Sequence, residues 1–194
     1  NGGNIGKIKL EFFHGNILAQ QEPVVNEASG KAYRGGLELY AQGHYARAIQ
    51  LFKEAYTLDT RNVPALFAQG LALAKQDKHA EAAGIFEQVL RADPSNEKAL
   101  RMLPVSYFNA GDNGKAIGAY DRAIAAMPRN TSFYVGKARL LVRDNRIGDA
   151  AEVMKKAYDI DPCNIEIAEV YAQTLGELGR MDESYQVAVR ILEK

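Results

Sequence analysis

The chain repeats itself every 34 residues, and this period limits its fold more than any other feature of the sequence. A fixed period of this length is typical of a chain built from copies of one small helical or stranded unit, each contacting its neighbours. The sequence therefore predicts an array of repeats. The residues that keep the spacing are Pro94, Pro128 and Pro162, then Asn62, Asn96, Asn130 and Asn164, and Ala48, Ala82, Ala116 and Ala150.

The composition argues against several kinds of function. Lys and Arg number 24 and Asp and Glu also number 24, so no overall field favours nucleic acid or an anionic membrane. Cys163 is the one cysteine, and His14, His44 and His79 show no spacing of metal ligands. Phosphate-binding and nucleophile-elbow motifs do not occur either. We therefore expect no catalytic residues, no cofactor and no metal, and we predict that the chain is not an enzyme.

The location of the protein stays open at this stage. No apolar run approaches the roughly 18 residues that a membrane-spanning helix needs, so we expect no membrane insertion. The chain opens Asn-Gly-Gly without a methionine, which suggests processing or trimming. We expect a cytoplasmic location or, if a signal peptide was removed, a periplasmic one.

One full period carries a recognisable pattern. It reads VPALFAQGLALAKQDKHAEAAGIFEQVLRADPSN over residues 63–96. Gly70 is a small residue within the expected first helix, Ala82 and Phe86 lie on the second, and Pro94 follows it. This arrangement resembles the tetratricopeptide repeat. Composition and repeat style also look bacterial.

The resemblance implies an all-α fold, a right-handed α-solenoid of about five helix-turn-helix repeats over residues 28–194. A segment of residues 1–27 lies outside the period. The repeats span 29–62, 63–96, 97–130, 131–164 and 165–194, and the fifth follows the pattern least well. We expect helices near 29–42, 45–58, 63–76, 79–92, 97–110, 113–126, 131–144, 147–160, 165–178 and 181–193.

Turn and cap residues are expected at fixed places in each repeat. The tight turn within a repeat falls at Gly43, Gly111 and Gly179, with Asp77 and Asn145 as turn-compatible replacements. The asparagine that ends each of the first four repeats is expected to cap the next helix, because its side chain can accept from an orphan backbone N–H.

The resemblance also assigns residues to a binding surface, because the first helix of each tetratricopeptide repeat lines the concave side of the array. Arginines give the middle of this groove a positive character, whereas Glu166, Glu169 and Glu177 make the last repeat acidic. A ligand with an apolar stripe and an acidic flank would suit this distribution. The candidate peptide-binding residues are Tyr33, Leu37, Tyr40, Phe67, Leu71, Arg101, Met102, Val105, Phe108, Arg139, Val142 and Arg143.

Two alternatives accompany this assignment. A single aromatic residue at helical spacing can equally pack between neighbouring helices and never contact a ligand. Relatives that bind acidic chaperone tails carry Lys and Asn at set groove positions, and of the matching residues here only Lys98 fits. We therefore do not expect a co-chaperone of that kind. The matching residues in the first three repeats are Tyr33, Leu37, Ala68, Lys98 and Met102.

Pro104 departs from the pattern, because the matching position holds Gly36, Gly70 or Ala138 in other repeats. A proline inside a helix removes one hydrogen bond, and we expect a kink there. The kink either reshapes the superhelix or widens the groove beside Arg101 and Phe108.

The two ends of the chain raise a separate question. Residues 1–27 alternate polar and apolar around Lys7 to Phe12, and Pro23 precludes a smooth helix into the array. This segment is expected to be a cap over the first repeat, a peptide that fills a groove, or a remnant of processing. At the other end, Tyr185, Val189 and Leu192 are expected to be exposed on the last helix.

These observations favour a non-catalytic adaptor or scaffold that holds a peptide or helix of a partner protein in its groove. The alternative is a structural protein that self-assembles through residues 1–22 or through its last helix.

Overall fold

The computed structural model describes residues 26–192, with the side chains of residues 26–190. The predictions for residues 1–25, including the cap, the groove-filling peptide and self-association through residues 1–22, lie outside this part, as does the side chain of Leu192. The described part consists of helices joined by short turns and has no strand, which confirms the all-α fold. The helices are α1 Glu27–Ala41, α2 Tyr45–Leu58, α3 Val63–Ala74, α4 His79–Ala92, α5 Glu97–Asn109, α6 Asn113–Ala126, α7 Thr131–Arg143, α8 Ile147–Ile160, α9 Ile165–Glu177 and α10 Met181–Leu192.

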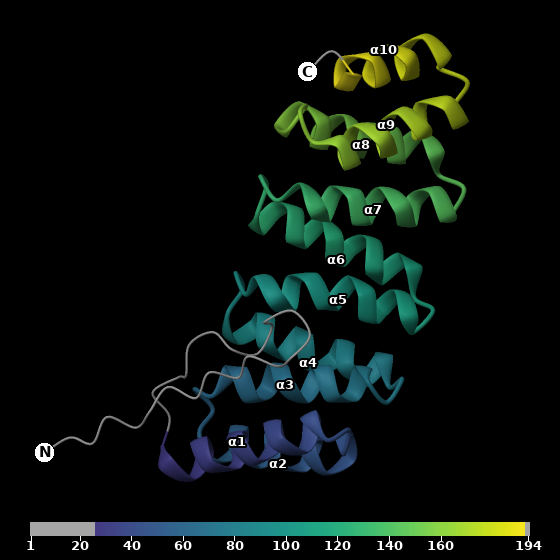
Figure 1. Cartoon of the computed structure of the whole chain (residues 1–194). Coiled ribbons are helices and arrows are strands. Elements are labelled where there is room, and N and C mark those ends of the chain that lie inside the picture. Colours follow the sequence, from purple (N-terminus) through teal and green to yellow (C-terminus); the bar gives the residue numbers. More distant parts are fainter. Residues whose placement is uncertain (1–25, 193–194) are drawn as a thin grey trace, which may run out of the picture. The chain divides into compact units, whose positions relative to one another are not determined.

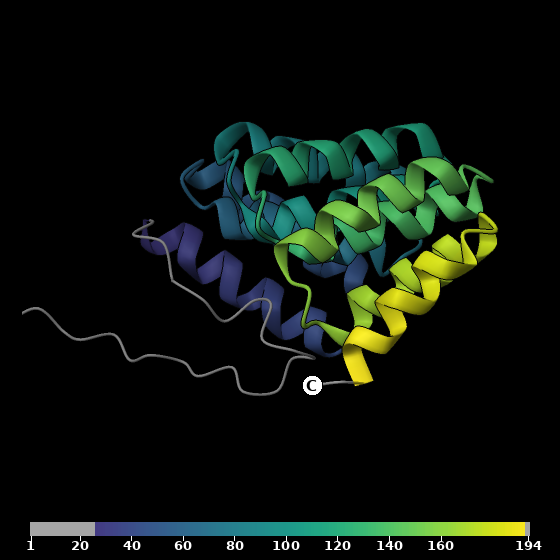
Figure 2. The ribbon, with the colours of Figure 1, turned by 90° about the horizontal axis from the view of Figure 1, so that it is seen from above.

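The helices form two compact units, which meet in the sequence between the second and third repeats. The N-terminal unit ends at Asp93 and contains the hairpins α1–α2 and α3–α4. The C-terminal unit begins at Pro94 and contains α5–α6, α7–α8 and α9–α10 (Figure 1). In the last hairpin α9 and α10 lie side by side (Figure 2). Every helix begins and ends within two residues of its predicted bounds.

The turn predicted within each hairpin is present in all five. Gly43, Gly111 and Gly179 have φ angles of 79°, 84° and 75°, in the left-handed region that glycine adopts without steric cost. Asp77 and Asn145 take the same role with φ of 59° and 57°. Both residue types tolerate this conformation better than most, because their short polar side chains bond locally.

The predicted asparagine caps form at three of the four positions. The side-chain oxygens of Asn62, Asn96 and Asn164 accept from the backbone N–H three residues on, at 3.1, 3.1 and 3.3 Å. The prediction is wrong for Asn130, which has no such cap bond. Its Oδ1 instead accepts from the Ser132 hydroxyl at 2.6 Å, so the oxygen is engaged within the first turn of α7. The cap of α1 is Asn26, which starts this helix two residues before the predicted bound.

A buried polar network joins the start of α1 to the loop between α2 and α3. The Asn62 amide donates to the Ser29 hydroxyl at 3.0 Å, and this hydroxyl donates to the Ala55 carbonyl at 2.7 Å. Asp59 accepts from the Asn26 backbone N–H at 3.1 Å. The Arg61 guanidinium hydrogen-bonds the Asp59 carboxylate at 2.9 and 2.8 Å, which holds the pKa of that carboxyl well below its usual range. The network fixes the first two repeats against each other.

The core of each hairpin in the N-terminal unit depends on a close approach between a glycine and a ring. A Cβ added to Gly36 would lie 2.6 Å from the Phe52 ring, and one added to Gly70 would lie 2.7 Å from the Phe86 ring. Both rings are fully buried. The small residue on the first helix thus makes room for the aromatic residue of the second, as ridge-into-groove packing requires.

The third repeat solves the same packing problem differently. Pro104 occupies the place of Gly36 and Gly70, and it is buried within α5, which continues on both sides of it. The ring of Tyr120, which takes the position of Phe52 and Phe86, approaches Gly136 of the next hairpin instead, with the phenol 2.6 Å from an added Cβ. Burial raises the pKa of the Tyr120 hydroxyl. The expected kink at Pro104 stays a prediction.

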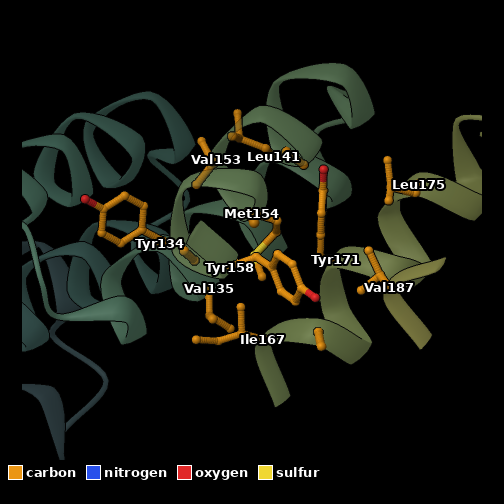
Figure 3. Close-up of a cluster of buried hydrophobic side chains, with 14 residues drawn as sticks. Tyr134, Val135, Leu141, Val153, Met154, Tyr158, Ile167, Tyr171, Leu175 and Val187 are labelled. Atoms are coloured by element: carbon orange, nitrogen blue, oxygen red, sulfur yellow. The ribbon is translucent and has the colours of Figure 1, made fainter. Parts of the chain in front are cut away.

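The C-terminal unit has its own core between α7, α8, α9 and α10. Met154 lies at its centre, with Tyr158 and Tyr171 beside it (Figure 3). The two tyrosine rings are 5.6 Å apart between centroids. Val187 is the buried residue that α10 contributes. The methionine in the aromatic position of the fourth repeat therefore packs as the phenylalanines do in the first two.

Candidate partner-binding surface

The structure separates the candidate residues into two groups that differ in exposure. The first group belongs to the N-terminal unit and is buried: Tyr33 is 9% exposed, Leu37 5%, Phe67 4% and Leu71 8%. Tyr40 is half-buried, and burial raises the pKa of its hydroxyl. Four of the five candidate residues in the N-terminal unit therefore offer a ligand little surface.

Contacts within the hairpins explain this burial. The Tyr33 ring lies 5.9 Å from Phe52, and the Phe67 ring lies 5.4 Å from Phe86, between centroids. Each pair joins the first and second helix of one hairpin. Such tilted aromatic pairs are favourable packing arrangements. The geometry thus supports the alternative that these aromatics are core residues.

The second group lies on α5 and α7 of the C-terminal unit and reaches solvent. Val105 is 40% exposed, one of few large apolar side chains in the described residues with so much exposure. We call this set the α5–α7 face. Its exposed members are Arg101, Val105, Arg139 and Arg143, and its half-buried members are Met102, Phe108 and Val142.

Arg101 is held by neighbours on both helices. Its guanidinium donates to Glu97 at 2.7 and 3.2 Å and to the Ser132 hydroxyl of α7 at 3.3 Å. Glu97 also accepts from the Asn130 amide at 3.2 Å. This small network joins the starts of α5 and α7 and neutralises the Arg101 charge.

Arg139 is also paired, but with the next hairpin. Its guanidinium donates to Glu166 of α9 at 2.9 Å. Glu166 is one of the three glutamates that were expected to make the last repeat acidic, and all three are exposed. The positive charge of Arg139 and the negative charge of Glu166 therefore partly cancel where the middle of this surface meets the last repeat.

Arg143 has a ring contact, as Arg101 has with Phe133 at 5.7 Å, but it differs from Arg101 and Arg139 in its charge partners. Its guanidinium lies over the Phe108 ring, 4.6 Å from the centroid, so that a residue near the end of α7 rests on one near the end of α5. In the part of the chain that the structure describes, no carboxylate lies within ion-pair distance of Arg143. Its charge is therefore available to a ligand.

Sequence reasoning missed two features of this region. It did not anticipate the bonds from Asn130 to Glu97 and from Arg101 to Ser132, because the partners of each bond are about one repeat apart and meet only when α5 and α7 come together. It also missed that Tyr120 packs on Gly136. The available signal was the pair of departures from the period, Pro104 in place of glycine and a glycine at position 136.

Among residues 26–192, no group of three His, Cys, Asp or Glu side chains is placed to hold a metal ion. Within that same range no helix has the length and apolar character needed to cross a membrane. Cys163 is exposed in the loop before α9.

The ten helices of residues 26–192 form hairpins of one period, which defines a helical-repeat protein. The family model of the tetratricopeptide repeat matches residues 33–97 and 105–164, more than half of the chain. The chain therefore belongs to the tetratricopeptide repeat family. Members of this family generally mediate protein–protein interactions and are typically non-catalytic. The search of curated proteins found no match.

Solved structures support the fold. MamA from Desulfovibrio magneticus RS-1 is 18% identical, with a TM-score of 0.69, and the match covers 87% of this chain and 96% of that one. Another MamA structure is 21% identical with a TM-score of 0.71, covering 86% and 91% of the two chains. A tetratricopeptide repeat protein from Parabacteroides merdae is 16% identical, with a TM-score of 0.72, over 87% and 67%. At these identities the likeness concerns the fold alone.

Proposed function

We propose that this chain is a non-catalytic adaptor that binds a peptide or helix of a partner protein on the α5–α7 face. The single observation that carries this proposal is the exposure of Arg101 and Val105 on α5, at positions where the residues one period earlier, Phe67 and Leu71, are buried in the N-terminal unit. Val105, Met102 and Val142 offer apolar contacts, and Arg143 offers a charge. Apolar residues rimmed by polar ones are typical of protein interaction sites.

The rigidity of the surface also favours binding. The face stands on helices, and the bonds from Arg101 to Ser132 and from Asn130 to Glu97 join α5 to the start of α7 before a ligand arrives. Binding to a preorganised surface avoids the entropic cost of ordering the receptor. We therefore expect the ligand, rather than the chain, to become ordered.

The test is a pulldown from the native host with quantitative identification of what is retained. Val105→Asp places a charge at the centre of the face and should remove the partner. Leu58→Asp is the matched control, because Leu58 is 43% exposed on α2, and Val105 is 40% exposed. Equal recovery of every partner by Val105→Asp and by the natural chain would show that the face is not the binding site.

Self-assembly through the last helix is the second candidate, and one observation favours it. Met181 and Tyr185 on α10 are 64% and 72% exposed, whereas Ala151, one period before Tyr185 on α8, is 3% exposed. The position that is buried on α8 thus carries an exposed ring on α10. Light scattering over a range of concentrations tests this candidate, since a constant monomer mass contradicts it.

A further inference from the structure

The three arginines of the α5–α7 face do not have equal capacity to bind an anion. Arg101 is paired with Glu97 at 2.7 Å and Arg139 with Glu166 at 2.9 Å, so an incoming carboxylate would have to compete with an existing one. Arg143 has the Phe108 ring on one side and no carboxylate partner among the described residues. We infer that Arg143, held on Phe108, binds a single carboxylate of the partner peptide. This inference rests on the proposed function.

The stacking on Phe108 decides how a ligand approaches Arg143. A ring against one face of the guanidinium leaves the N–H groups at its edge free, and these form the planar fork that matches a carboxylate. The ring contact spans α5 and α7, so it limits the rotamers of a long side chain that would otherwise be mobile on the surface. The guanidinium is therefore positioned before the ligand binds.

The chemistry favours a carboxylate over a phosphate. A phosphorylated residue carries a charge of about −1.5 to −2 at pH 7 and usually requires more than one cation. Arg143 offers one unpaired charge, and the charges of Arg101 and Arg139 are already neutralised. Lys98 lies near the opposite end of α5, about 15 Å along the helix from Phe108 at 1.5 Å per residue. One Asp or Glu side chain, or a chain terminus, satisfies this site.

Neighbouring side chains add a second requirement. Phe108 and Val105 are one helical turn apart on α5, and Val142 adjoins Arg143 on α7. The ligand should therefore carry an apolar side chain close to its acidic group. Arg143 is not among the positions at which relatives of this family hold acidic chaperone tails, namely Tyr33, Leu37, Ala68, Lys98 and Met102, so the inferred site is a different one.

The experiment selects peptides with the full chain from a displayed library of short random sequences, then measures their affinities. We expect the selected peptides to share an Asp or Glu at a fixed distance from a large apolar residue. Replacing that acid by its amide should weaken binding to the natural chain about tenfold or more. In Arg143→Gln the same replacement should change the affinity less than about twofold, because the two groups act as a pair.

Arg139→Gln is the matched control, since Arg139 is an exposed arginine on the same helix that already has a partner. In Arg139→Gln, replacing the acid of the peptide by its amide should weaken binding as much as it does with the natural chain. Circular dichroism should show that both variants unfold like the natural chain, because both side chains are exposed. If replacing the acid by its amide weakens binding to Arg143→Gln as much as it weakens binding to the natural chain, the inference is wrong. If a peptide with phosphoserine in place of the acid binds more than about tenfold more tightly than the original peptide, the ligand group is a phosphate and not a carboxylate.

Failure of this inference can be told apart from failure of the proposed function. If the selected peptides carry no acid but bind the Val105→Asp variant more weakly than the natural chain, the α5–α7 face is still the binding site. Only the role of Arg143 is then wrong. If no selected peptide depends on Val105, the proposed function fails, and the inference fails with it.

Discussion

The N-terminal and C-terminal units share one repeat but use its first helices differently. In the N-terminal unit, Phe67 lies against Phe86 and is 4% exposed, so the first helix is used for packing. In the C-terminal unit, the residue one repeat after Phe67 is Arg101, and Val105 four residues on is 40% exposed. The same position is thus a core position in one unit and a surface position in the other. A repeat family match assigns positions, but side-chain contacts decide which positions can bind.

The largest expected effect comes from removing a buried ring on the first helix. Phe67→Ala should lower the free energy of unfolding by about 3–5 kcal/mol, because it leaves a cavity beside Phe86. Val105→Ala should change it by no more than about 0.5 kcal/mol, because Val105 is exposed. Urea unfolding followed by circular dichroism measures both. If Phe67→Ala unfolded like the natural chain, Phe67 would be a surface residue and the comparison would break.

An intermediate effect is expected at the glycines that face rings. Gly70→Ala should cost about 1–3 kcal/mol, because the new Cβ would lie 2.7 Å from the fully buried Phe86 ring. Gly84→Ala is the control on the same hairpin: its Cβ meets no atom within 4 Å, and alanine should stabilise α4 by about 0.5–1 kcal/mol. The same unfolding measurement applies.

The corresponding pair in the C-terminal unit sharpens this test. Gly136→Ala brings a Cβ within 2.6 Å of the Tyr120 phenol, but Tyr120 is half-buried and its ring can shift toward solvent. We expect a smaller loss than for Gly70→Ala, with Gly118→Ala, an exposed glycine in α6, as its control. An equal loss at both positions would mean that the two units pack with the same rigidity.

The smallest effect concerns the caps. Asn62→Ala should cost about 1–2 kcal/mol, since Asn62 caps α3 and bonds the buried Ser29 hydroxyl. Asn130→Ala should cost about 0.5 kcal/mol or less, because Asn130 makes no cap bond and is less buried. Thermal unfolding of the two variants in parallel gives the difference. Losses of the same size would contradict the distinction drawn between the caps.

Most of the fold could be predicted because its causes are local. A left-handed turn at Gly43 or Asn145 and a cap at Asn96 depend on a few neighbouring residues, so the sequence indicates them directly. The cap at Asn130 failed because a nearby hydroxyl, that of Ser132, competes for the same oxygen. Such competition depends on side-chain conformations that the repeat pattern does not contain.

The candidate surface was predicted less completely than the fold. The period placed Phe67 and Arg101 at the same register position, and so the sequence treated both as groove residues. Register states the side of the helix on which a residue lies, but not how deeply its neighbours cover it. The pairing of Arg139 with Glu166 could not be anticipated either, because it requires a distance set by the packing of α7 on α9. The pairing of Arg101 with Glu97 is different, because residues four apart on one helix are neighbours by helix geometry alone.

The 34-residue period by itself determined that this chain is a tetratricopeptide array, where its helices lie and which residues turn and cap them, because these properties follow from backbone preferences and spacing. The tertiary structure alone decided which first helices bury their side chains and which expose them. It also decided that, of the three arginines on the α5–α7 face, Arg143 rests on a ring without a carboxylate partner among the described residues. Exposure and the pairing of Arg139 with Glu166 depend on contacts between residues far apart in the sequence, and a periodic pattern does not specify those contacts.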